Sequence, residues 1–101
     1  MIHVFARAEI KPECLDAYVE ILKDIVPKVR QEPGCVYYAP CFDWRKPGDD
    51  SGKVYVTMVE SWKDKASLDA HGAGPVLAEF KRRFEGMRGS AEGWVLQSII
   101  D

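Results

Sequence analysis

Cysteine pairs, long hydrophobic runs and a strong net charge are all missing from this sequence, and each absence excludes a class of protein. The three cysteines are odd in number and show no CxxC spacing, so neither a disulfide framework nor a zinc site is expected. We interpret them as reduced thiols that pack as small apolar groups. A net charge of −2 argues against nucleic acid or an anionic membrane as the main partner. No hydrophobic run approaches transmembrane length.

The start of the chain, residues 1–7, lacks the charged beginning and long apolar stretch of a signal peptide, so we expect a cytoplasmic protein. What is present favours a packed core. Of the 101 residues, 47% are hydrophobic and 30% are charged. This length and composition predict a single folded domain over residues 1–101.

Hydrophobic periodicity predicts the element order β-α-β-β-α-β. Strands alternate apolar residues with a period of two, and helices repeat them every three or four residues. Pro27 is expected to interrupt the first helix, because proline removes a backbone donor. The predicted segments are strands over 2–11, 35–43, 53–62 and 92–100, a helix over 13–31, a short helix over 64–71 that Asp64 caps, a helical stretch over 76–87 and a hairpin loop over 44–52.

Two prolines refine this prediction. Pro33 and Gly34 suit a type II turn, in which proline sets one dihedral and glycine accepts the positive one. Pro40 cannot donate to a strand ladder, so the 35–43 strand is expected at a sheet edge or with a bulge.

The element order implies a ferredoxin-like α+β sandwich with the first and third strands in the centre. The helices then cover only one face of the sheet. The other face carries His3, Phe5 and the second apolar side of the 53–62 strand. We expect a homodimer that buries this face.

A carboxylate, an indole and an imidazole follow one another at the end of the third strand. Glu60 and Trp62 lie two residues apart, and His71 follows nine residues later at the end of the short helix. The chain passes from strand to helix within this stretch, which brings the three groups toward one end of the sheet. The turn at Glu32-Pro33-Gly34 strengthens this interpretation.

Together these features resemble the antibiotic biosynthesis monooxygenase family, the dimeric α+β barrels that include quinol monooxygenases. The matching features are Arg7 on the opening strand, the Glu32-Pro33-Gly34 turn, the Glu60-Ser61-Trp62 strand end and Ala70-His71 before a helix break. The resemblance implies two sheets paired back to back and a pocket in each subunit between sheet and helices. It also implies oxidation of electron-rich aromatics by dioxygen without metal, flavin or haem.

The resemblance also indicates to which branch of the family the sequence is most similar. Haem-degrading members use an asparagine, a tryptophan and a histidine where this chain places Ala6, His71 and Phe80, so haem is not expected and no cofactor is predicted. Members that oxidise anthrone-type compounds carry an asparagine and a tyrosine near the places of Met58 and Leu68 here. The generic quinol-monooxygenase group remains, and a related branch isomerises a small phosphorylated dione.

Each candidate residue has more than one interpretation. His71 is a catalytic base, or else a capping or solvated histidine. Glu60 is a base, an orienting group or the partner of Arg7 in a salt bridge. Trp62 is a pocket wall or core. Lys81 and Arg82 are solvated, or one of them contacts an anionic substrate. The predicted substrate-binding residues are Trp62, Ala6, Tyr18, Met58, Phe80 and Phe84, with Ala8 as a further small residue beside them; no metal site is expected.

The preferred hypothesis is a cofactor-independent monooxygenase that oxidises a small quinol-like or phenolic compound with dioxygen. One alternative is a proton-transfer isomerase of a small carbonyl compound, which needs the same acid and base but no oxygen. Another is a non-catalytic dimer that binds small apolar ligands.

Overall fold

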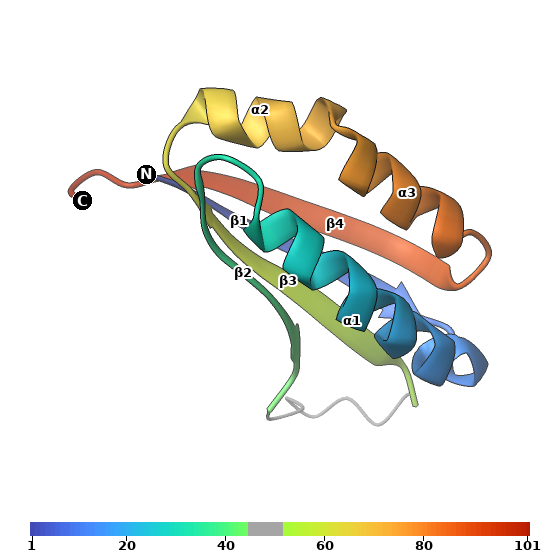
Figure 1. Ribbon diagram of the computed structural model, residues 1–101. Coiled ribbons are helices and arrows are strands. Elements are labelled where there is room, and N and C mark those ends of the chain that lie inside the picture. Colours follow the sequence, from blue (N-terminus) through green and yellow to red (C-terminus); the bar gives the residue numbers. More distant parts are fainter. Residues whose placement is uncertain (45–51) are drawn as a thin grey trace.

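The computed structural model describes residues 1–44 and 52–101, and in it the helices lie on one side of a four-stranded antiparallel sheet (Figure 1). This confirms the predicted ferredoxin-like α+β class. Most of the hairpin loop predicted over 44–52 lies outside the described residues. In chain order the elements are β1 (Ile2–Ile10), the 3-10 turn η1 (Pro12–Cys14), α1 (Leu15–Arg30), β2 (Cys35–Phe42), β3 (Val54–Trp62), α2 (Lys65–Ala73), α3 (Pro75–Arg83) and β4 (Arg88–Gln97).

The strand order is β2-β3-β1-β4, which confirms that the first and third strands are central and that β2, with Pro40, is an edge strand. The register between β1 and β3 sets Val4 opposite Glu60 and Arg7 opposite Thr57. Opposed residues in an antiparallel pair point to the same side of the sheet. The helix-covered face therefore carries the even-numbered residues of β1, and the open face carries its odd-numbered residues.

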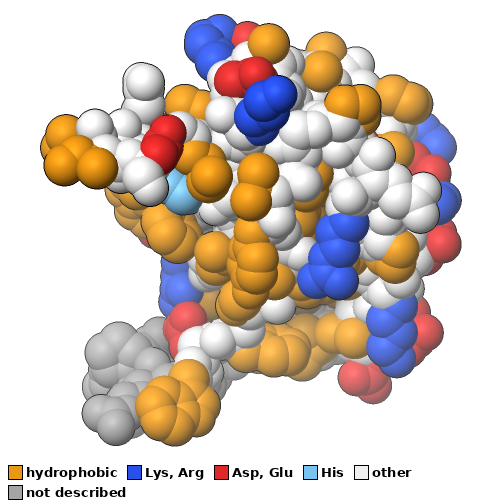
Figure 2. Space-filling model, turned by 60° about the vertical axis from the view of Figure 1, so that its left-hand side comes forward, with side chains coloured by type: hydrophobic (Ala, Val, Ile, Leu, Met, Phe, Trp, Pro, Cys, Tyr) orange, Lys and Arg blue, Asp and Glu red, His pale blue; other side chains and the backbone are white. Residues whose placement is uncertain are grey.

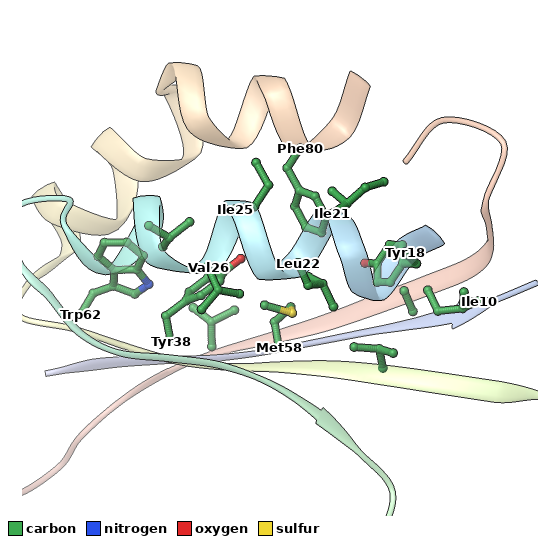
Figure 3. Close-up of a cluster of buried hydrophobic side chains, with 14 residues drawn as sticks. Ile10, Tyr18, Ile21, Leu22, Ile25, Val26, Tyr38, Met58, Trp62 and Phe80 are labelled. Atoms are coloured by element: carbon green, nitrogen blue, oxygen red, sulfur yellow. The ribbon is translucent and has the colours of Figure 1, made fainter. Parts of the chain in front are cut away.

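The core lies between the helix-covered face and α1. Apolar residues at helical spacing bury one side of α1, and Figure 3 shows the row of side chains from α1 and the sheet that meet between them. Trp62 lies at one end of this row, Tyr18 and Ile10 lie at the other, and Tyr38 and Met58 lie between them (Figure 3). Trp62 and Ile10 are fully buried.

Several boundaries differ from the prediction. α1 runs through Pro27 to Arg30, so the proline does not end the helix. α3 stops at Arg83, although Phe84 and Met87 still pack against the core. The fourth strand, predicted over 92–100, spans Arg88–Gln97. Its first residues pair with the far end of β1, across an irregularity between Ala8 and Ile10, even though they carry little β-propensity.

Beyond β4 the chain leaves the sheet, and Ile99 and Ile100 are almost fully exposed. In Figure 2 hydrophobic side chains reach the surface at several places, including the end of the chain that projects from the body. Within the described residues, the helices fall short of the length and apolar character that a membrane span requires.

Candidate active site

His71 lies near the end of α2, and its imidazole is buried with an exposed fraction of 5%. Its Nδ1 is 2.6 Å from Oε1 of Glu32. A carboxylate oxygen can only accept, so Nδ1 donates this hydrogen bond. The neutral ring then keeps its lone pair on Nε2, the form in which a histidine accepts a proton. The structure therefore contradicts the interpretation of His71 as a solvated side chain.

The Glu32 carboxylate is held by the turn that follows α1. The backbone N–H of Cys35 donates to the Glu32 carbonyl at 3.1 Å, and Gly34 has a φ of +81°, as predicted for the type II turn. Gly34 also packs directly on the start of α2, where an added Cβ would lie 2.0 Å from Oγ of Ser67. Only glycine fits this contact, and the contact fixes Glu32 relative to α2.

The start of α2 is fixed in turn by its N-cap. The Asp64 carboxylate accepts from the backbone N–H of Ser67 at 2.8 Å, which confirms the predicted cap. Two turns later the same helix presents His71 toward the sheet.

Trp62 lies beneath His71. The two rings are 4.6 Å apart between centroids with an interplanar angle of 31°. The indole N–H of Trp62 donates to Oε1 of Glu60 at 2.9 Å. Trp62 thus contacts both titratable residues but does not line the neighbouring cavity.

Glu60 does not pair with Arg7, so that expectation was wrong. The register places the two side chains on opposite faces of the sheet. On the open face, Arg7 instead donates to both carboxylate oxygens of Asp43, at 2.8 and 2.6 Å. Glu60 remains on the helix-covered face, where burial raises its pKa, while the hydrogen bond from Trp62 and the neighbouring His71 oppose that rise.

A cavity of about 280 Å³ lies between the helix-covered face and the helices. It brings together seven of the eight predicted site residues, and Trp62 is the exception. Its apolar walls surround a few polar groups, the composition expected of a small-molecule site. The lining residues are Val4, Ala6, Ala8, Tyr18, Tyr38, Val56, Met58, Glu60, Leu68, His71, Gly72, Leu77, Phe80, Lys81, Phe84 and Arg88.

Tyr38 is a cavity residue that the sequence analysis missed. Burial raises its pKa, with a further contribution from the charge of Glu60, and burial also raises the pKa of Tyr18, against the effect of Arg88. Both phenols therefore stay neutral at ordinary pH and can donate hydrogen bonds. Tyr38 lies two residues before Pro40 on the same strand, so alternation puts the two on one face of the sheet. A bulge between Cys35 and Tyr37 shifts the register, and the sequence alone therefore does not show which face this is.

A second hollow, of about 350 Å³, lies between α1 and β2. Its walls are apolar apart from Lys23 and Arg30, and it holds no histidine, carboxylate or phenol. Its groups that can exchange a proton are the exposed Lys23, which pairs with Glu20, and the Cys41 thiol. The cavity beside His71 is therefore the better candidate for chemistry.

Metal ligands do not gather in the described part of the chain, where no three His, Cys, Asp or Glu side chains are placed to hold an ion. Cys14, Cys35 and Cys41 are free thiols and partly buried. The cysteines take no part in the cavity.

This sequence and fold are similar to those of known proteins. The family model described as antibiotic biosynthesis monooxygenase matches residues 1–88. A solved structure described as antibiotic biosynthesis monooxygenase is 27% identical with a TM-score of 0.82, and the match covers 99% of this chain and 100% of that one. No curated protein matches the sequence.

Two further solved structures show the same similarity. A conserved protein from Methanosarcina mazei Go1 is 25% identical with a TM-score of 0.82, covering 95% of this chain and 90% of that one. A protein from Pseudomonas aeruginosa is 25% identical with a TM-score of 0.77, covering 98% of this chain and 94% of that one. The fold is thus shared along nearly the whole length of each chain.

Proposed function

Because this chain belongs to the antibiotic biosynthesis monooxygenase family, we propose that it is a cofactor-independent monooxygenase that oxidises a small quinol-like or phenolic compound with dioxygen. The observation that carries the proposal is the buried His71, which contacts a carboxylate on one side and an apolar cavity on the other. A base beside a dry pocket is what phenol deprotonation requires.

His71 is the proposed base. With Nδ1 donating to Glu32, its Nε2 accepts the hydroxyl proton of a substrate ring in the cavity. Glu32 is a positioning residue that stabilises the imidazolium. His71 and Glu32 also line a hollow beside the Pro33 turn and α2, so a proton held by the pair can exchange with solvent.

Deprotonation makes the substrate ring electron-rich. The phenolate passes one electron to dioxygen, and the resulting radical and superoxide combine at a ring carbon. The peroxide takes a proton, and loss of water leaves a carbonyl at that carbon. One oxygen atom enters the product and the other leaves as water, and the substrate supplies all four electrons.

The other polar groups of the cavity orient the substrate. The Tyr38 and Tyr18 hydroxyls donate hydrogen bonds to substrate oxygens. The apolar side chains of the cavity wall, among them Ala6 and Phe80, exclude water. Trp62 fixes Glu60 and supports the His71 ring from below. Trp62 and Glu60 then influence the reaction through the position of the His71 ring and through the charge near it.

We also propose that two copies associate through the open face. Phe5, Trp94 and Leu96 lie on this face, where the register sets Phe5 opposite Trp94. All three side chains remain exposed in the single chain. A second copy is the occupant expected for a large apolar sheet face in a family of paired sheets.

Oxygen uptake with a panel of reduced quinones, in the presence of a chelator, tests the function. We expect the parent protein to consume oxygen, and His71→Ala and His71→Asn to lower the rate at least about 100-fold. His3→Ala is the matched control, since His3 lies on the open face between Ser61 and Ser98. A parent rate equal to that of buffer would contradict the proposal.

A proton-transfer isomerase is a second candidate, because the cavity offers an acid as well as a base. Burial raises the pKa of Glu60, which favours a protonated carboxyl opposite His71. Such an enzyme converts a small carbonyl compound at the same rate with and without oxygen. Turnover that persists under anaerobic conditions would favour it, whereas binding without turnover of either class would indicate a ligand-binding module.

A further inference from the structure

Some basic side chains pair with a carboxylate and others do not. Lys23, Lys28, Lys65 and Arg83 each form an ion pair with a carboxylate. For Lys81 and Arg88, no carboxylate lies within ion-pair distance among residues 1–44 and 52–101. Among the unpaired ones of the described residues, which also include Arg30 and Arg82, Lys81 on α3 and Arg88 on β4 are the two that line the cavity holding His71.

Arg88 is held in place by an aromatic ring instead of a carboxylate. Its guanidinium lies 4.4 Å from the centroid of Phe84, which is itself a cavity residue. This contact fixes the direction of the guanidinium and leaves its hydrogen-bond donors free for a ligand. Lys81 lies on α3, three residues before Phe84, and is exposed.

The two cations lie at the end of the cavity away from Glu60. Along β1, Val4 is opposite Glu60 and Ile10 is opposite Arg88. These six residues correspond to about 20 Å of strand. Tyr38 and Tyr18 lie between the two ends in that order (Figure 3), and the charge of Arg88 opposes the rise that burial causes in the pKa of Tyr18.

We propose that Lys81 and Arg88 form an anion-binding subsite, and that the substrate is a hydroxylated aromatic acid. This inference rests on the proposed function for its reacting hydroxyl, which lies at His71. The carboxylate arm lies at the other end of the cavity, against Lys81 and Arg88. The Glu32 carboxylate, which accepts from His71, repels that arm from the end where the reaction occurs, so the charges select one orientation.

The size of the cavity limits the acid to one ring. A volume of about 280 Å³ is at the lower end of the range for small-molecule pockets. A single hydroquinone ring with a short arm fits this space. It is shorter than the strand between the two ends, and the long Lys81 and Arg88 side chains, which line the same cavity as His71, make up the difference. The probe is therefore a hydroquinone with a propanoate arm, and its matched neutral partner is the corresponding propanamide.

Binding of the two probes, measured by calorimetry without oxygen so that no turnover occurs, tests the subsite. We expect the parent to bind the acid about tenfold more tightly than the amide. Lys81→Met and Arg88→Met should each remove most of this preference and leave amide binding unchanged. Arg82→Met is the matched control, because it removes the same charge from the same helix outside the cavity lining.

Equal binding of acid and amide by the parent would overturn the subsite, and so would an equal loss of preference in Arg82→Met. Lys81 is exposed, so Lys81→Met keeps the test valid even if Arg88→Met disturbs the contact with Phe84. Oxygen uptake then separates the two proposals. An acid that binds through Lys81 and is not oxidised supports the subsite and contradicts the monooxygenase.

Discussion

The two faces of the sheet carry the same alternating pattern but meet different surroundings. On the helix-covered face, Ile10 and Trp62 are fully buried beneath α1 and α2. On the open face, Phe5, Trp94 and Leu96 keep exposed fractions of 38%, 49% and 46%. Hydrophobic periodicity thus decides which residues share a face, and the helices alone decide which face is covered within one chain.

Polar groups on the two faces are also used differently. On the open face they satisfy each other, since Arg7 pairs with Asp43 and His3 lies between Ser61 and Ser98. On the helix-covered face, Glu60 and the phenols point into a cavity with room for a ligand. An apolar face whose polar groups pair with one another suits a protein partner, whereas phenols and a carboxyl that line a cavity suit a small molecule.

Ile10→Lys should produce the largest effect that separates the two faces. Ile10 has an exposed fraction of 0%, and its cross-strand neighbour is the cation Arg88, so an added ammonium is buried beside a like charge. A buried unpaired charge should lower the free energy of unfolding by at least about 4 kcal/mol. Urea unfolding followed by circular dichroism measures this loss.

The matched control is on the same strand. Glu9, next to Ile10, lies on the open face near Ser90, so Glu9→Gln should change the unfolding free energy by less than about 1 kcal/mol. An Ile10→Lys variant as stable as Glu9→Gln would mean that the helix-covered face is not the core.

Phe5→Glu should instead break association and leave the fold intact. Phe5 is opposite Trp94 on one side and Val59 on the other, at the centre of the open face. A carboxylate there remains solvated in the single chain but becomes buried when two copies meet, which should weaken association at least about 100-fold. Light scattering after size exclusion measures the mass of the parent and the variant.

For this comparison the control is Val36→Glu, an exposed residue of the β2 edge. It adds the same charge away from Phe5. A parent that elutes as a single chain, or a Phe5→Glu variant that keeps the mass of a dimer, would contradict association through the open face.

Much of the fold could be predicted because its signals are local. The alternation in residues 2–11, the proline and glycine of the 33–34 turn and the Asp64 cap each act within a few residues. These signals fix which residues share a face. They therefore also grouped Ala6, Met58 and Glu60 toward the helices, and the structure brings these three into one cavity.

The rest depends on contacts between distant segments. The absence of an Arg7–Glu60 pair follows from the β1–β3 register, and the face of Tyr38 follows from a bulge. The bond from His71 to Glu32 needs the turn at Gly34 to pack on α2. No spacing along the chain reports these contacts, because each joins residues dozens of positions apart or depends on one inserted residue.

Glu60→Gln should have the smallest effect of the three test substitutions, and it tests whether the helix-covered face holds a carboxyl with a raised pKa. Burial raises the pKa of Glu60 above its ordinary value of 4.5, while the Trp62 hydrogen bond and His71 oppose the rise. As the pH rises from the ordinary value to the raised one, the unfolded chain loses a proton that the folded protein keeps. Stability therefore falls across this window, and the deficit persists at higher pH.

Glutamine keeps an acceptor for the Trp62 indole and has no proton to lose. Relative to the parent, Glu60→Gln should gain on the order of 1 kcal/mol in unfolding free energy between about pH 4 and pH 8. Urea unfolding at several pH values measures this difference, with the exposed Glu85→Gln as control. If the difference between Glu60→Gln and the parent stays constant with pH, the Glu60 carboxyl is solvated. The helix-covered face would then hold no poised acid, and its titratable groups would resemble those of the open face.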